Sequence, residues 1–248
     1  LVVRYGRYVV NMVQGDLGTS YKNDLSVWDQ VMERFPNTAV LAVAGILVAL
    51  IIGIPAGIIS AKKQYSVVDN VSMVLSLIGV SMPVFMTALV LQYLFAFKFK
   101  WFPVSGFDSF RAMILPAIVL GWNSAGSIAR MTRSNLVEIM QNDFIRTARA
   151  KGLRERTVVY KHALKNALIP VVTLAGMQFS QVFAGAVLVE TVFNWPGMGR
   201  LAYESILRKD YPTLLGILFC SVFVVIIANV LTDFAYRFLD PKMRVGRR

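Results

Sequence analysis

Five long runs without a charged side chain dominate this 248-residue sequence. A helix rises 1.5 Å per residue and needs ~20 apolar residues to cross the hydrocarbon core of a bilayer, and each run is about that long or longer. Backbone groups in lipid must bond within their own segment, and the runs do not alternate with polar residues, so they predict helices and not barrel strands. We therefore expect an all-α, polytopic transmembrane helical bundle. The five predicted spans are 35–61, 70–97, 112–129, 166–189 and 211–232.

Basic residues between the spans orient this bundle. The segments 61–67, 130–166 and 237–248 hold 16 of the 26 Lys and Arg residues, and the remaining connections hold the other 10 over more residues. By the positive-inside rule the three basic segments, and with them the C-terminus, are cytoplasmic. No basic–aromatic interleaving or nucleic-acid motif accompanies the charge, so we expect membrane lipid and protein partners and no nucleic acid.

This orientation divides the chain into an extracytoplasmic head, residues 1–35, and a transmembrane domain, residues 36–248. Residue 1 would lie outside, although no apolar signal sequence precedes Pro36. Either a short head crosses the membrane unaided, or a further helix precedes Leu1 in the intact subunit. We favour the further helix, which gives six helices in all.

The segment 130–166 is the only long hydrophilic stretch between two spans, and it carries nine basic residues against three acidic ones. Its apolar residues recur at helical spacing on both sides of Gly152, a residue that can end a helix with φ > 0. The pattern predicts a helix–Gly–helix element at the membrane surface. It favours a protein contact over simple adsorption to anionic lipid, because small residues at Ala148 and Gly152 would let a partner backbone approach closely.

Signatures of catalysis are absent from the sequence. It contains no Gly-rich phosphate loop, no HExxH, no CxxC and no GxSxG, and it has one histidine and one cysteine, His162 and Cys220. We expect no catalytic residues, no metal site and no cofactor in this chain. The spans hold almost no ionisable residues and no evident inverted repeat, which argues against a self-contained secondary carrier. Any energy for transport would then enter from a partner.

Polar side chains within the spans mark a candidate translocation path. Gln178, Gln181 and Gly185 fall on one face of the fourth span, at i, i+3 and i+7. Amides are unfavourable in lipid unless paired, so this face should meet either neighbouring helices or a water-filled path. A membrane scaffold without a transport role would not explain such a stripe.

Two further features concern backbone shape. Pro83 removes a backbone hydrogen bond within the second span, so it predicts a kink and is a candidate hinge. Trp195, Pro196 and Gly197 predict a tight turn with proline at i+1 and glycine at i+2. On the outer side of the membrane, that turn is a candidate external gate loop.

Several of these motifs together resemble one family. Arg146-Thr147-Ala148-Arg149-Ala150-Lys151-Gly152-Leu153, followed by His162-Ala163-Leu164-Lys165-Asn166, is similar to the cytoplasmic coupling loop of ABC importer permeases, in its dipeptide/oligopeptide/nickel form. The other matching motifs are Gly15-Asp16-Leu17-Gly18-Thr19-Ser20, Ser81-Met82-Pro83, the run VETVFNWPGMGR at 189–200, and Asp240-Pro241-Lys242. They occur in family order over nearly the whole chain.

The resemblance implies a type I ABC importer permease fold and a non-catalytic subunit that forms half of a translocation path in a prokaryotic cytoplasmic membrane. It implies four kinds of partner: a second permease, two ATPase subunits that bind ATP and Mg, an extracytoplasmic substrate-binding protein, and a peptide substrate. Nickel or another small solute is the alternative substrate. The residues that would couple to the ATPase are Arg146, Thr147, Ala148, Arg149, Lys151, Gly152 and Leu153.

One position departs from the general importer pattern. Counting back from Gly152, Arg146 stands where most permeases of the superfamily carry glutamate. If the helix docks with this side toward the ATPase, the facing groove should be acidic.

Overall fold

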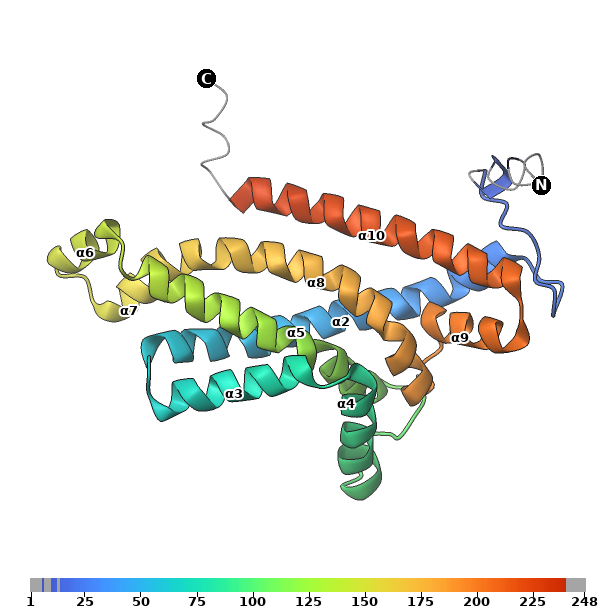
Figure 1. Cartoon of the computed structure of the whole chain (residues 1–248), viewed down its shortest axis with the longest axis horizontal. Coiled ribbons are helices and arrows are strands. Elements are labelled where there is room, and N and C mark those ends of the chain that lie inside the picture. Colours follow the sequence, from blue (N-terminus) through green and yellow to red (C-terminus); the bar gives the residue numbers. More distant parts are fainter. Residues whose placement is uncertain (1–5, 7–9, 13, 240–248) are drawn as a thin grey trace.

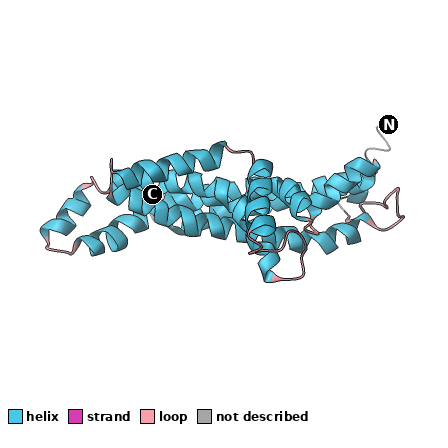
Figure 2. Cartoon of the chain, turned by 90° about the horizontal axis from the view of Figure 1, so that it is seen from below, coloured by secondary structure: helices cyan, strands magenta, loops and turns pink. Residues whose placement is uncertain are grey.

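The computed structural model describes residues 6, 10–12 and 14–239. Long helices run side by side along one axis, and short helices and loops connect them at the two ends (Figure 1). Helices make up most of the described chain, as Figure 2 shows. The elements are α2 (Val27–Lys62), α3 (Val67–Ser81), α4 (Val84–Leu91), η1 (Gln92–Lys98), α5 (Phe110–Ile139), α6 (Asp143–Ala150), α7 (Glu155–Thr157), η2 (Val158–Ala163), α8 (Leu164–Phe193), α9 (Met198–Arg208) and α10 (Tyr211–Leu239).

Four helices are long and apolar enough to cross a membrane, and they correspond to the first, third, fourth and fifth predicted spans. The helices exceed the charge-free runs. α2, for example, begins at Val27 and crosses the boundary expected at residue 35 without a break. Ser26 caps its start by accepting a hydrogen bond from the Asp29 amide.

The second predicted span is bent and not straight. α3 ends at Ser81, and α4–η1 departs from it at 108°, so the pair counts as a fifth span only if it crosses as one unit. The break falls at the predicted proline. Met82, which precedes it, is extended with φ −76° and ψ 130°, as the ring of Pro83 requires of its neighbour. In Figure 1, α3 runs beside the bundle while α4 points away from it.

Close packing of α2 against α5 forms the centre of the bundle. A Cβ atom on Gly53 would lie 2.7 Å from the carbonyl oxygen of Ala125, and one on Gly121 would lie 2.6 Å from that of Gly45. Small residues therefore let the two backbones approach, as is usual between membrane helices. α8 packs against both α5 and α2, and α10 packs against α8.

The two ends of the bundle are built differently. At one end, which we call the α6 end, a buried apolar cluster joins α6 and η2 to the ends of α2, α5 and α8. At the opposite end, the α9 end, the loop before α2 is tied to the start of α10. There the Asp210 carboxylate accepts hydrogen bonds from the Ser20 hydroxyl (2.5 Å) and the Tyr21 amide (3.0 Å).

Candidate functional site

The predicted helix–Gly–helix element is present at the α6 end. α6 ends at Ala150, and Gly152 adopts φ +76°, the left-handed conformation expected of it. The Gly152 amide donates to the carbonyl of Arg149 (2.9 Å), which closes the last turn. The chain then enters α7 and η2, which lead directly into the long α8.

Two side chains attach α6 to the bundle. Ile145 and Ala148 are buried in the cluster formed with Leu136 and the ends of the long helices. Ala148 was expected to face a partner backbone, but it points into its own chain. The exposed side chains of the predicted coupling set are Arg146, Thr147, Arg149, Lys151 and Leu153, and Phe144 is exposed beside them.

An ion pair spans the turn at Gly152. Arg149 donates from Nε and Nη2 to the two oxygens of Glu155, at 3.1 and 2.8 Å. This bidentate geometry is the strong form of the arginine–carboxylate interaction, and it raises the pKa of the Arg149 guanidinium. The pair therefore links α6 to α7 across the turn.

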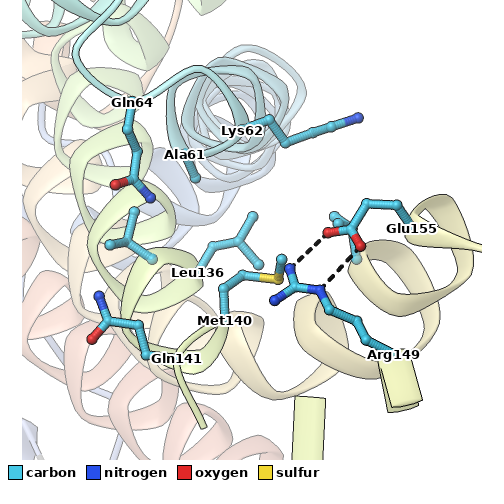
Figure 3. Close-up of a pocket in the computed structure, with 10 residues that line it drawn as sticks. Ala61, Lys62, Gln64, Leu136, Met140, Gln141, Arg149 and Glu155 are labelled. Carbon is cyan, nitrogen blue, oxygen red and sulfur yellow. Dashed lines mark hydrogen bonds and ion pairs between the residues drawn. The ribbon is translucent and has the colours of Figure 1, made fainter. Parts of the chain in front are cut away.

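Arg149 and Glu155 line one side of a groove of about 350 Å³. Figure 3 shows the pair beside Leu136 of α5 and Met140, which directly follows α5, with Ala61 and Lys62 at the end of α2 and Gln64 in the turn after it. The groove thus joins the α6 turn to two of the long helices, so a change in the position of α6 bears directly on α2 and α5.

The polar stripe on α8 faces away from the chain's own core. Gln181 is exposed, Gln178 and Gly185 are half-buried, and Phe183 on the opposite side is buried in the core. A Cβ on Gly185 would meet no other atom within 4 Å. Packing against helices of the same chain therefore does not explain Gln181 or Gly185, and this face is available to a path or to a second subunit.

The predicted gate loop lies at the α9 end and is tied to α2. The Gly197 amide donates to the carbonyl of Trp195 (2.9 Å), so the turn spans three residues centred on Pro196 and not the four expected. Trp195 is 3% exposed, and its indole N–H donates to the carbonyl of Asn37 (3.0 Å). The Asn37 amide donates in return to the carbonyl of Pro196 (2.8 Å).

The prediction overlooked one residue near this loop, Glu190, which is fully buried at the end of α8. Its sequence signal is a lone acid at the end of an apolar run, a few residues before two glycines. Elsewhere, no group of three or more His, Cys, Asp or Glu residues that could hold a metal ion occurs in the described part of the chain.

The chain matches a known family and named relatives. Residues 53–245 match the family described as the binding-protein-dependent transport system inner membrane component. The chain is 38% identical to the dipeptide transport system permease protein DppB of Alkalihalophilus pseudofirmus, over 98% of the chain and 81% of that protein. It is also 38% identical to the oligopeptide transport system permease protein AppB of Bacillus subtilis, over 97% of the chain and 80% of that protein.

Solved structures share the fold. A chain of the MetNI methionine ABC transporter, in inward-facing conformations, superposes with a TM-score of 0.73 at 17% identity, over 85% of this chain and 96% of that one. A chain of an amino acid ABC transporter with histidines gives 0.66 at 14% identity, over 84% and 94%. The type I importer permease fold is therefore confirmed. The family match and the identity to the two permeases show that this chain belongs to the family of binding-protein-dependent transport system inner membrane components.

Proposed function

We propose that this permease is one half of the membrane channel of an ATP-driven importer for di- or oligopeptides. The relatives named above are dipeptide and oligopeptide permeases at 38% identity over nearly the whole chain, which supports this substrate class. A second permease would form the other half of the path. Two partner ATPase subunits would bind ATP and Mg, and an extracytoplasmic binding protein would deliver the peptide.

The arrangement of α6 is the observation that carries the coupling role. Its inner side is attached by Ile145 and Ala148, its outer side presents Arg146, and Lys151 is exposed directly after its end. A short helix attached in this way can be pushed as a unit by an ATPase subunit. The ends of α2, α5 and α8 share its apolar cluster, so they would move with it.

The charge of the α6 end supports a cytoplasmic location. The segment 130–166, which includes the turn between α5 and α8, holds nine of the 16 basic residues that the positive-inside rule places in the cytoplasm. The α9 end, with the gate loop and the 14–26 segment, would then face the binding protein. Gln178 and Gln181 would line the path between the two ends, because amides donate and accept hydrogen bonds without imposing a charge on varied peptides.

Uptake by the whole complex tests the proposal. The permease would be purified with its second permease, ATPase subunits and binding protein, and reconstituted in vesicles. ATP-dependent accumulation of a radiolabelled dipeptide is expected, and ⁶³Ni²⁺ offered in parallel is expected to stay outside. Accumulation of nickel without the dipeptide would overturn the peptide assignment.

A charge reversal on α6 tests coupling in the same vesicles. Arg146→Glu should lower uptake at least about tenfold and weaken retention of the ATPase, because the side chain is exposed toward the expected acidic groove. Its ion pair with Asp143 is an exposed 3.6 Å contact, which contributes little to stability. Lys63→Glu, at an exposed lysine just after α2 on the same end, is the matched control. Equal uptake by the two variants would count against coupling through α6.

A further inference from the structure

The buried carboxylate of Glu190 receives hydrogen bonds from two other helices. Its Oε1 accepts from the hydroxyl of Thr38 on α2 (2.6 Å), and its Oε2 accepts from the backbone amide of Arg200 on α9 (2.9 Å). No Lys, Arg or His side chain in the described part of the chain forms an ion pair with Glu190, and the Arg200 guanidinium binds Glu204 instead (2.9 Å).

These contacts cap the start of α9. The first amides of a helix have no partner within the helix, and its N-terminus favours negative charge. The Met198 amide donates to the Thr38 hydroxyl (2.8 Å), and the Arg200 amide donates to Glu190 (2.9 Å). A carboxylate from α8 and a hydroxyl from α2 thus satisfy the first turn of α9, whose cap residue, Gly197, has no side chain to do so.

Two glycines make room for the carboxylate. A Cβ on Gly197 would collide with the carboxyl group of Glu190, and one on Gly199 would lie 2.5 Å from the Cα of Val187. Neither glycine has a positive φ. They are therefore required by the close approach of α9 to α8 and not by the backbone conformation.

The gate loop is held to the same helices. Trp195 and Pro196 are bonded to Asn37 of α2, as described above, and the Trp195 ring meets that of Phe107 edge to face at 4.9 Å. We call the set formed by Asn37, Thr38, Glu190 and the 195–200 segment the α9 corner. Side chains on α2 and α8 supply most of its polar contacts.

From this geometry we infer that Glu190 is a positioning residue that makes the α9 corner a single rigid body. The loop at 195–197 then does not open as a separate flap; it moves only together with α8, α9 and the adjoining part of α2. The part of this inference that concerns transport rests on the proposed function: during transport, the polar stripe on α8 and the gate loop would change position together. Glutamine replaces one acceptor oxygen by an NH₂ group and removes the charge, so it weakens the contacts that Glu190 makes with the Thr38 hydroxyl and the Arg200 amide.

A cysteine introduced on the buried side of α9 tests whether α9 separates from the helices it packs against. Ser205 is 4% exposed on α9, and Ser205→Cys would be introduced after the sole cysteine of the chain is removed by Cys220→Ser. A membrane-impermeant maleimide is added to the reconstituted complex with and without ATP, and labelling is read on this chain after electrophoresis. Leu207→Cys, on the exposed side of the same helix, is the matched control for reagent access.

With Glu190 intact, the thiol introduced by Ser205→Cys should stay protected in both nucleotide conditions, while the thiol introduced by Leu207→Cys reacts. Glu190→Gln should raise the labelling rate of the buried thiol at least about tenfold, since hydrogen bonds to a charged group are among the stronger ones. Thr38→Val, which removes only the bridging hydroxyl, should also raise the labelling rate of the buried thiol. This second variant serves as the test if the Glu190→Gln complex does not assemble. Thr38→Ser, which keeps the hydroxyl, should restore protection, a rescue that general destabilisation would not produce.

Labelling of the Ser205→Cys variant that depends on ATP while Glu190 is intact would overturn the inference, because it would show the corner opening during the cycle. Unchanged protection of this thiol in both Glu190→Gln and Thr38→Val would overturn it as well. Peptide uptake by the parent complex is measured in the same vesicles. Failure of uptake there would refute the proposed function, whereas the labelling pattern reports on the corner in either case.

Discussion

Asp69 and Arg133 form a bidentate ion pair that joins α3 to α5. The Arg133 Nε and Nη2 atoms donate to the two oxygens of the Asp69 carboxylate, both at 2.7 Å. The Asp69 side chain is 2% exposed and that of Arg133 is 25% exposed. The same carboxylate accepts from the Tyr65 amide (2.9 Å), so one side chain holds the turn between α2 and α3 against α5.

Removal of the arginine should destabilise the permease measurably. Arg133→Gln leaves a buried carboxylate without its cation, which costs about 3 kcal/mol by analogy with other buried pairs. We expect a lower temperature of irreversible aggregation in detergent, followed by fluorescence-detected gel filtration. Arg130→Gln, at an exposed arginine one turn earlier on α5, should leave that temperature nearly unchanged. Equal losses in the two variants would show that the pair contributes nothing specific.

The conformation of Gly152 leads to a graded prediction. Asparagine tolerates φ > 0 better than other residues with side chains, and a β-branched residue tolerates it poorly. We expect Gly152→Asn to retain most peptide uptake and Gly152→Val to lose most of it. A Cβ at this position meets no atom of the chain within 4 Å, so any difference comes from the backbone and not from an internal clash.

Charge at the same position tests the partner. Gly152→Asp should still allow the complex to bind ATP but should abolish substrate-stimulated hydrolysis and uptake, because a partner surface should approach this turn. Full uptake by Gly152→Asp would remove the turn from the coupling interface, whatever the result with valine.

Thiol labelling along α8 should distinguish its two faces. In the Cys220→Ser background, cysteine at 178, 181 or 185 should react with water-soluble reagents to an extent that changes with ATP. Cysteine at 179 or 183 should react little, because Phe183 is buried in the core and Phe179 packs against it. Labelling that is equal on both faces and independent of nucleotide would show that α8 does not line a gated path.

Asp210 should attach the 14–26 segment in a way that depends on pH. Burial opposes its charged form, but hydrogen bonds from Ser20, Thr213 and Tyr21 outweigh burial and lower the pKa of Asp210 below its ordinary value of 3.8. A lowered pKa means that the carboxylate stabilises the folded state above pH 3.8 and loses this effect as the pH falls through its folded pKa.

Asp210→Asn should therefore speed trypsin cleavage after Lys22 severalfold at neutral pH. Asp24→Asn is the control: Asp24 has φ +55°, which asparagine tolerates, and its side chain is exposed. Identical cleavage rates in the two variants would show that Asp210 does not hold this segment. Below pH 3.8 the parent protein should itself become more susceptible to an acid protease in the same region.

The sequence alone determined which parts of the chain can lie in lipid and where the α6 turn falls. Charge-free length is a direct physical requirement of a membrane span, so α2, α5, α8 and α10 could be predicted from it. Glycine at 152 likewise predicted a left-handed helix end, because few other residues adopt that conformation. The charge-free runs did not predict where the helices end. α2 begins at Val27 and includes Asp29 and Glu33, because a charged residue is unfavourable in lipid but is compatible with a helix in water.

Only the tertiary structure decided how the spans bend and which distant side chains meet. Four prolines lie inside continuous helices, namely Pro36, Pro55, Pro116 and Pro170, whereas the chain turns by 108° at Pro83. A proline therefore allows a bend, but the surrounding tertiary structure determines whether the helix bends there. Ala148 faces inward for a similar reason: the apolar cluster at the α6 end selects the buried side of α6.

The buried polar contacts were the part of the structure least predictable from the sequence. Glu190 lies 152 positions from Thr38, and Asp69 lies 64 from Arg133, so no local pattern pairs them. A buried carboxylate must find donors, and which donors it finds depends on the helices that the fold places beside it.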